Sequence, residues 1–258
     1  MLFCKMNGLG NDYIFFDREN VSTKDINFLK SSKEVIKQLS DRNFGIGGDG
    51  VVIIEPSKIA DAKMLIYNAD GSEATMCGNA LRCVGKMLYE KHCGVRDEFS
   101  VETLSGEKHL NIIKADKRKA IVCADMGCPK IVKATENMEF IDVGNPHIVL
   151  YSSTLDDDVM VTAKELSIKY DSNVEVVQVG LGNLRMRVWE RGSGETLACG
   201  TGATAVAFSA FQKGLIGREA KIELKGGALI AKNQGGSVSL IGDATLNYIG
   251  EIDLKNYG

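Results

Sequence analysis

Several features are scarce in this sequence, and each scarcity excludes a class of protein. Only 3 of the 258 residues are proline, and no low-complexity linker is present, so the halves of the chain are expected to pack closely. No apolar run reaches the roughly 20 residues that a helix needs to cross a bilayer. The N-terminal apolar residues are interrupted by Lys5 and lead into turn residues, which is not the pattern of a signal peptide.

An excess of charge of either sign is also missing. The 31 basic and 34 acidic residues give a net charge of −3, so no general attraction to nucleic acid or to an anionic membrane is expected. The 7 cysteines are odd in number and irregularly spaced, which is unlike a disulfide framework. Without an export pattern, they are expected to be reduced thiols in a cytoplasm, where they can exchange protons.

What is present is typical of a globular protein of one large domain or of two domains of about 130 residues. Hydrophobic residues make up 44% of the chain and charged residues 25%. The periodicity of apolar residues gives a coarse assignment of elements. Strands are expected at 12–17, 51–55, 63–67, 99–103, 108–114, 119–125, 147–151, 174–180, 184–190, 221–224, 228–232, 237–241 and 244–249, and helices at 31–42, 79–91, 162–168 and 202–213.

The sequence also repeats itself. EATMCGNALR (73–82) and ETLACGTGAT (195–204) each place a Glu four residues before a Cys-Gly pair that opens a helical pattern, at an offset of 199 − 77 = 122 residues. GNDYIFF (10–16) and GNPHIVL (144–150) match at an offset of 144 − 10 = 134. The difference between the offsets indicates an insertion or deletion between the matched blocks. The repeat predicts two similar lobes, each with a Gly-Asn turn and a Cys-Gly helix start.

A cysteine at the start of a helix has particular chemistry. The unpaired backbone N–H groups and the positive end of the helix dipole bind anions such as carboxylates and lower the pKa of a nearby thiol. Two such starts facing one another could hold one carboxylate while a sulfur stands on either side of the neighbouring carbon. That arrangement suits inversion of an amino-acid α-carbon, with one thiolate removing a proton and the opposite thiol supplying one, and it requires no Schiff-base cofactor. A single cysteine is more often a small buried hydrophobe, but the matched pair Cys77 and Cys199 favours the catalytic interpretation.

These residues resemble a known family. NADGSEATMCGNALRC (68–83) and ERGSGETLACGTGA (190–203), with GLGNDY (8–13) and GNPH (144–147), are similar to the diaminopimelate epimerases, in order from residue 6 to about 250. The resemblance implies conversion of LL-diaminopimelate to the meso form without pyridoxal phosphate, a step in the synthesis of lysine and of peptidoglycan precursors. It also implies a homodimer, whereas the charge balance and the cysteine spacing predict no nucleic-acid, membrane or metal partner.

The resemblance, with the repeat, implies an α+β fold of two lobes, each a curved, mainly antiparallel sheet around a central helix, with the active site in the cleft between them. The expected lobes are residues 1–117 and 118–245, and the C-terminal strand at 246–258 is expected to return to the first lobe.

The resemblance assigns roles to individual residues. Cys77 and Cys199 become the two acid–base residues, and Gly78, Asn79, Gly200 and Thr201 the helix-start positions that hold the reacting carboxylate. The substrate-binding positions are Asn11, Asn68, Asn145, Asn173, Glu190 and Arg191, and His147 and Glu190 lie close to the thiols. Arg191 could bind a carboxylate through two hydrogen bonds. A surface charge pair at Glu190 and Arg191 and a structural role for His147 remain alternatives.

Two other patterns in the sequence resemble known binding motifs. Gly45, Gly47 and Gly50 match the dinucleotide fingerprint, but a helical pattern precedes them and a strand follows, the reverse of what that fingerprint needs. A zinc site is a second possibility, with Cys77, Cys83, His92 and Cys93 as ligands. Their spacing does not match the regular ligand spacing of structural zinc sites. A cofactor-independent racemase for another amino acid and a non-enzymatic binding protein of the same fold remain alternatives. Gly50 stands where some relatives have Gln, which puts one substrate contact in doubt.

Overall fold

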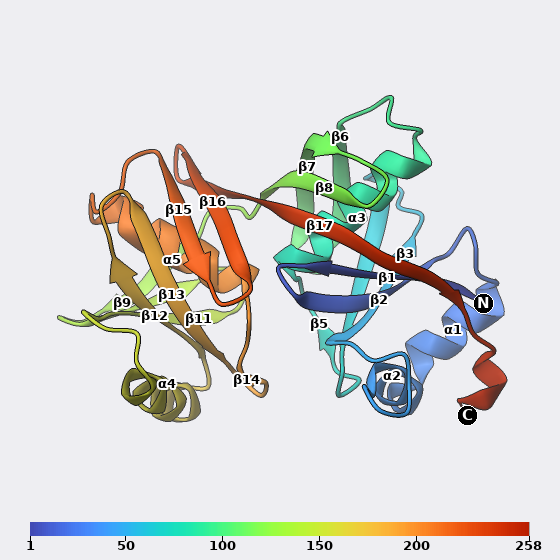
Figure 1. Cartoon of the computed structure of the whole chain (residues 1–258), viewed down its shortest axis with the longest axis horizontal. Helices are drawn as coiled ribbons and strands as arrows, with labels where there is room; N and C mark the ends of the chain where they lie inside the picture. The colour runs from blue at the N-terminus through green and yellow to red at the C-terminus, as the bar shows by residue number, and fades with distance from the viewer. Residues whose placement is uncertain (258) are drawn as a thin grey trace. The chain divides into compact units, whose positions relative to one another are not determined.

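The structure, a computed structural model, describes residues 1–257, which form two compact units (Figure 1). The first unit contains Met1–Cys123 and the segment from Asp243 onward, and the second contains Ala124–Gly242. The chain passes between the units along two strands, β8 (Lys119–Asp125) and β17 (Ser237–Glu251). Within residues 1–257, no helix is both long and apolar enough to span a membrane.

The first unit is a strongly curved sheet with one central helix. Strands pair in the order β17, β1, β2, β3, β4, β6 and β7, and β8 pairs with β17. Its remaining elements are β1 (Leu2–Gly8), β2 (Asn11–Asp17), α1 (Thr23–Ser31), α2 (Lys33–Ser40), β3 (Gly50–Glu55), β4 (Ala62–Asn68), β5 (Glu73–Ala74), α3 (Gly78–Lys91), β6 (Glu98–Thr103), β7 (Gly106–Ala115) and η1 (Leu254–Asn256).

The second unit repeats this order. Its strands pair as β9, β10, β11, β12, β13, β15, β16 and β17. The elements are β9 (Lys130–Ala134), β10 (Met138–Asp142), β11 (Pro146–Tyr151), α4 (Asp157–Tyr170), β12 (Asn173–Val179), β13 (Asn183–Glu190), β14 (Gly194–Glu195), α5 (Gly200–Gln212), β15 (Glu219–Leu224) and β16 (Gly227–Gln234).

The pairing registers confirm the internal duplication. β2 and β3 run parallel with Tyr13 opposite Gly50, and β11 and β12 run parallel with His147 opposite Asn173. In each unit, the short strand before the central helix pairs with the strand that precedes it, through Glu73 in one and Glu195 in the other. The two-lobed α+β fold expected from the sequence is therefore confirmed.

The central helices are buried on nearly all sides. α3 contacts β1, β2, β6 and β7, and α5 contacts β10, β11, β12, β15 and β16. Residues 200–210 of α5 are all buried. Small residues such as Gly, Ala and Thr dominate this helix, so backbone and sheet can approach closely on every face, as is typical of an enclosed helix. The N-terminus of each central helix is therefore held in place by the sheet of its own unit.

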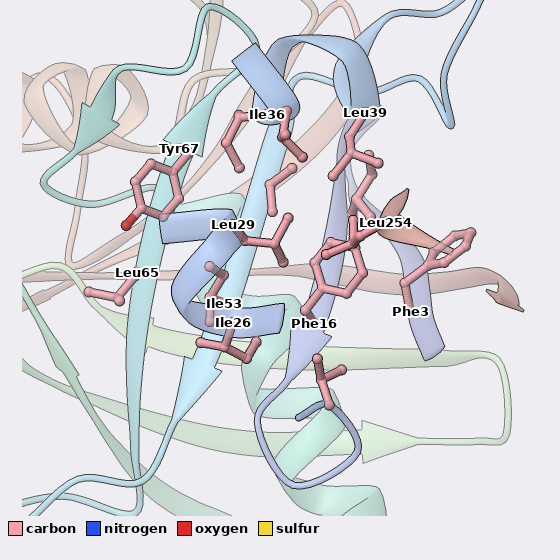
Figure 2. Packing of buried hydrophobic residues seen from close by; sticks show 14 residues of the cluster. Phe3, Phe16, Ile26, Leu29, Ile36, Leu39, Ile53, Leu65, Tyr67 and Leu254 are labelled. Carbon is pink, nitrogen blue, oxygen red and sulfur yellow. The ribbon is translucent and has the colours of Figure 1, made fainter. Parts of the chain in front are cut away.

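The outer faces of the sheets are covered by other helices. In the first unit, Ile26 and Leu29 of α1 and Ile36 and Leu39 of α2 pack on Ile53, Leu65 and Tyr67 of the strands, and Leu254 of the C-terminal segment joins this cluster (Figure 2). In the second unit, Met160 and Ala163 of α4 pack on Val174 and Val176 of β12. Because side chains alternate along a strand, Glu175 projects from the opposite face of β12.

The structure differs from the sequence-based elements in several places, among them the two short strands β5 and β14, which were not expected. The helix expected at 31–42 is the second of two, because Ser32 takes an extended conformation and its side chain caps α2 at the N–H of Val35. The helix expected at 162–168 begins at Asp157, capped by Asp156. β1, β9 and β10 lie where no strand was expected. The two strands expected between 237 and 249 are one continuous strand, β17, whose C-terminal part pairs with β1 in the first unit.

Candidate active site

Each of the two cysteines singled out by the sequence is the N-cap of a central helix. Cys77 precedes α3 with φ −141° and ψ 117°, and Cys199 precedes α5 with φ −127° and ψ 115°. The helices start at Gly78 and Gly200, slightly earlier than expected, so each cysteine directly precedes the first unpaired N–H groups of its helix, although the Cys77 side chain makes no cap hydrogen bond. Cys199 Sγ accepts a hydrogen bond from the Gly202 N–H at 3.4 Å. The duplicated backbone thus gives the two cysteines equivalent positions, each at the start of a central helix, while their side chains differ in burial and in partners.

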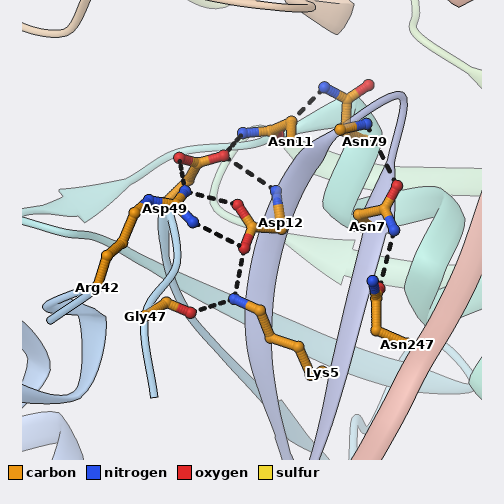
Figure 3. Close-up of polar contacts among 10 residues, drawn as sticks. Lys5, Asn7, Asn11, Asp12, Arg42, Gly47, Asp49, Asn79 and Asn247 are labelled. Atoms are coloured by element: carbon orange, nitrogen blue, oxygen red, sulfur yellow. Dashed lines mark hydrogen bonds and ion pairs between the residues drawn. The ribbon is translucent and has the colours of Figure 1, made fainter. Parts of the chain in front are cut away.

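The first half-site, in the first unit, contains Asn11, Cys77 and Asn79, and Figure 3 shows Asn11 and Asn79. Cys77 is half-buried, and its Sγ lies 3.5 Å from Asn11 Oδ1. The same oxygen accepts a hydrogen bond from Asn79 Nδ2 at 3.1 Å. Asn11 Nδ2 donates to Asp49 Oδ2 at 2.6 Å. Three of the predicted site residues are therefore in contact.

Asn68 lies at the end of β4, opposite Gly50 in β3. Its Nδ2 donates to Ser72 Oγ at 3.0 Å, in the turn that leads to β5. A Cβ on Gly50 would lie 2.0 Å from the carbonyl oxygen of Tyr67. The backbone at position 50 therefore accepts only glycine, and a glutamine there would require β3 and β4 to move apart.

The second half-site, in the second unit, is built around a buried histidine. His147 Nδ1 lies 2.8 Å from Glu175 Oε1, and His147 Nε2 lies 3.0 Å from Asn145 Oδ1. The side chains of His147 and Glu175 are both inaccessible to solvent. Glu175 Oε2 has no hydrogen-bond partner within residues 1–257. The pair brings a buried acid and a buried base to one end of the sheet, where Asn145 also lies.

The surroundings of Cys199 favour the protonated thiol, the opposite of the lowered pKa expected for a thiol at a helix start. Burial raises its pKa well above the usual value, and the carboxylates of Glu190 and Glu175 raise it further. Glu190 is hydrogen-bonded to Cys199 and also accepts from the Thr196 hydroxyl, while burial raises the pKa of its carboxyl group. Thr201 Oγ1 lies 3.4 Å from the sulfur. A protonated thiol in this position can serve as a proton donor.

Asn173 and Arg191 are adjacent at the edge of this half-site. Asn173 Oδ1 accepts a hydrogen bond from the Arg191 backbone N–H at 2.9 Å, and Asn173 Nδ2 donates to the Pro146 carbonyl at 3.3 Å. The guanidinium of Arg191 is about half exposed and pairs with the exposed carboxylate of Asp171 at 2.9 Å. A ligand carboxylate could compete with Asp171 for it.

Within each unit, the structure brings most of the predicted residues together. Asn11, Cys77 and Asn79 form one group, Glu190, Cys199 and Thr201 a second, Asn145 and His147 a third, and Asn173 and Arg191 a fourth, while Asn68 contacts Ser72.

Four residues of these groups were missed from the sequence: Asp49, Arg82, Glu175 and Thr196. A single carboxylate inside the apolar strand VEVVQV was a signal for Glu175. Arg82 is four residues after Gly78, on the buried face of α3, where a charged residue needs an explanation.

Comparison with known proteins places this fold in a family. The family model described as diaminopimelate epimerase matches residues 3–132 and 140–246. A diaminopimelate epimerase of Methanococcus maripaludis (strain C5) is 40% identical, covering 98% of this chain and 100% of the relative. One from Acetivibrio thermocellus is 39% identical, covering 99% of each.

Solved structures of other proteins share the fold. A hydroxyproline epimerase from Agrobacterium vitis superposes with a TM-score of 0.71 at 14% identity, covering 98% of this chain and 90% of that one. A PhzF-family phenazine biosynthesis protein from Bacillus anthracis gives a TM-score of 0.72 at 11% identity, covering 98% and 99%. At this level of identity the likeness concerns the fold alone. The match to the family model and the identity to full-length relatives show that the chain belongs to the diaminopimelate epimerase family of isomerases.

Proposed function

We propose that this chain converts LL-diaminopimelate to the meso isomer and that Cys77 and Cys199 are the two acid–base residues. The observation that carries the proposal is the equivalence of the two thiols, each the N-cap of the central helix of a duplicated unit. Inversion of a carbon requires a group on each of its faces, because a single base would return the proton to the side from which it came. A duplicated fold with one thiol in each half meets that requirement.

The proposed reaction is proton transfer at the α-carbon. One thiolate removes the α-proton, the extra charge moves onto the α-carboxylate, and the opposite thiol delivers a proton to the other face. Backbone N–H groups at Gly78, Asn79, Gly200 and Thr201 would donate to the carboxylate, where the charge develops. The raised pKa of the Cys199 thiol supports its role as a proton donor in the substrate-free state.

The residues around Cys199 would control its protonation. The Glu190 carboxyl group is hydrogen-bonded to Cys199, so it can accept or return the thiol proton, and its pKa is raised by burial toward the range of a useful acid–base group. His147, fixed by Glu175 and Asn145, would position the polar groups next to the sulfur. Opening the site to water would weaken all of these interactions.

The distal amino-acid head of the substrate would be bound by side chains. Asn68 and Asn173 can both donate and accept hydrogen bonds, and Arg191 can bind a carboxylate at two points once it leaves Asp171. Asn11 and Asn145 occupy equivalent turns of the two units and would bind the substrate close to the thiols. This assignment requires the two half-sites to act on one molecule.

The decisive measurement is isotope exchange. We expect the reduced protein, incubated in D₂O with LL-diaminopimelate and no added cofactor, to introduce deuterium at one α-carbon and to form the meso isomer. Histidine and glutamate serve as parallel substrates. Exchange only in another amino acid would identify a racemase, and exchange in none of them would contradict the two-thiol mechanism.

Oxidation offers a second test of the same site. If the two thiols lie on either side of one carbon, mild oxidation should join Cys77 to Cys199, abolish activity, and be reversed by dithiothreitol. Peptide mass spectrometry would identify the disulfide. The exposed Cys93 and Cys128 are internal controls for non-specific oxidation. Full activity in protein that carries this disulfide would contradict the assignment of the thiols.

Two further properties belong to the proposal. None of the seven cysteines is in a disulfide, and catalysis needs two of them as thiols, so we assign the protein to the cytoplasm, where thiols stay reduced. We expect a homodimer from the resemblance to the family. Size-exclusion chromatography with light scattering would measure the oligomeric state.

A further inference from the structure

A chain of side-chain amides lies behind Cys77 and is held by a charged group at each end. Its members are Asp49, Asn11, Asn79 and Arg82. Asn11 Nδ2 donates to Asp49 Oδ2 at 2.6 Å, Asn79 Nδ2 donates to Asn11 Oδ1 at 3.1 Å, and Arg82 Nη2 donates to Asn79 Oδ1 at 2.8 Å. The first part of this chain is visible in Figure 3.

The two ends determine the orientation of both amides. An amide group can be turned over without a change of shape, so its orientation follows from its partners. The carboxylate of Asp49 only accepts hydrogen bonds, so the NH₂ of Asn11 must face it. The guanidinium of Arg82 only donates, so the oxygen of Asn79 must face it. The remaining contact, from Asn79 Nδ2 to Asn11 Oδ1, is consistent with both ends.

The Asp49 end is itself fixed. Its Oδ2 also accepts from the backbone N–H of Asp12 at 2.9 Å, and its Oδ1 accepts from Arg42 Nη2 at 2.9 Å. Arg42 binds Asp12 as well, and Asp12 pairs with the buried Lys5 at 2.6 Å (Figure 3). The carboxylate of Asp49 therefore cannot turn away from Asn11 without losing several charge-assisted hydrogen bonds.

The Arg82 end is fixed by burial. Its side chain is inaccessible to solvent, and it donates to the carbonyls of Asp243 at 3.1 Å and Gly78 at 3.3 Å in addition to Asn79. A buried charged residue with no carboxylate partner of its own is costly. Two of its three hydrogen-bond partners, Gly78 and Asn79, are in the first turn of α3, and the third is the backbone of Asp243.

The fixed orientation of the two amides determines what the Cys77 sulfur contacts. Its Sγ is 3.5 Å from Asn11 Oδ1, an oxygen that is held in that position, so the sulfur meets an acceptor and the S–H donates to it. We infer that Asp49 and Arg82 are positioning residues that hold the amides of Asn11 and Asn79 in one orientation and thereby direct the Cys77 thiol toward Asn11 Oδ1. This inference rests on the proposed role of Cys77 as an acid–base residue. The device keeps the thiol protonated and aligned until substrate arrives.

The test is the pH dependence of Cys77 alkylation in Asp49 variants. Iodoacetamide reacts with the thiolate, so the rate at each pH, followed by peptide mass spectrometry, reports the thiol pKa. Asp49→Ala frees the NH₂ end of Asn11, and its oxygen then leaves Cys77 for part of the time. We expect alkylation of Cys77 near pH 7 to rise about three- to tenfold, as for a pKa lowered by half a unit to one unit. Epimerisation should slow about tenfold.

Asp49→Asn is the matched variant that separates orientation from charge. The backbone N–H of Asp12 and the NH₂ of Asn11 both require an oxygen at the Oδ2 position, so an asparagine would present its oxygen there. Its NH₂ would then replace the Oδ1 that accepts from Arg42, and the exposed Arg42 would keep its hydrogen bonds to Asp12. In Asp49→Asn, the rate of Cys77 alkylation should therefore depend on pH as it does in the wild type. If both variants shift the profile equally, Asp49 acts by its charge and the inference is wrong. An unchanged profile in Asp49→Ala would also overturn it.

Two controls keep the test independent of folding and of the proposed reaction. The limiting alkylation rate at high pH reports accessibility, and Cys199 in the same molecule should keep its wild-type rate. Arg82, Cys83 and Asp243, the neighbours whose charge acts on this region, are the same in all variants. If Asp49→Ala does not fold, Asp49→Ser, whose hydroxyl is too short to reach Asn11, takes its place. Because alkylation is measured without substrate, the result stands even if turnover proves to need other residues.

Discussion

Replacing Cys77 or Cys199 by alanine is expected to lower the kcat of epimerisation by about a thousandfold or more, the loss associated with removing an acid–base group from the transition state. The two variants should differ in exchange. Each keeps one thiol, so each should still exchange the α-hydrogen of only one stereoisomer with D₂O, and return it to the same face. The Cys77→Ala and Cys199→Ala variants should exchange opposite isomers. Mass spectrometry of chirally separated substrate measures both quantities.

A cysteine outside the two helix starts provides the control. Cys128 is exposed and is not at a helix start, so Cys128→Ala should retain wild-type activity and exchange. Retention of more than a tenth of kcat in either Cys77→Ala or Cys199→Ala would remove that thiol from the reaction. Exchange of both isomers in a single variant would show that one base serves both faces and would contradict the two-base mechanism.

The sequence predicted the architecture because the duplication was visible in it. The equivalent Cys-Gly helix starts and Gly-Asn turns predicted two similar lobes, and the matching registers of β2–β3 and β11–β12 confirm them. What the sequence did not show were elements without a clear period. β9 (Lys130–Ala134) is exposed along its whole length, so it lacks the alternation that identifies a strand, and α4 begins with acidic residues that suit a helix N-terminus but carry no apolar pattern.

The candidate site was predicted in part, because some of its residues belong to recognisable motifs and others do not. Motifs identified residues near helix starts and turns, and these do form contacts within each unit. Glu175 and Arg82 each stand among apolar residues of a strand or a helix, which sets them apart in the sequence but does not show what they contact. Only the three-dimensional structure shows that both are enclosed. A site shared by the two half-sites stays a prediction, which the exchange and oxidation experiments address.

Replacing Gly202 by alanine is expected to lower the stability of the protein, although a glycine-to-alanine change within a helix usually raises it. Within a helix, alanine is normally favoured over glycine by about 1 kcal/mol. Here a Cβ would lie 2.5 Å from Glu175 Oε1 and 3.1 Å from its Cγ and Cδ. Glu175 is enclosed and holds His147 at 2.8 Å, so it cannot move without breaking that pair. Overpacking of this kind costs about 1–3 kcal/mol, which offsets or outweighs the gain in helix propensity.

The effect on activity should be larger than the effect on stability. The Gly202 N–H binds Cys199 Sγ, so a shift of α5 that relieves the overlap moves the sulfur as well. A displacement of about 1 Å at a reacting group lowers the rate by roughly a hundredfold. We expect a lower Tm and a kcat reduced by that factor in Gly202→Ala. Gly217, in the same unit, has no atom within 4 Å of an added Cβ, so Gly217→Ala is the matched control and should change neither quantity. Wild-type kcat and Tm in Gly202→Ala would mean that the Glu175 side chain can move aside to make room for the added Cβ. The spacing between β12 and α5 would then not be what holds the Cys199 thiol in place.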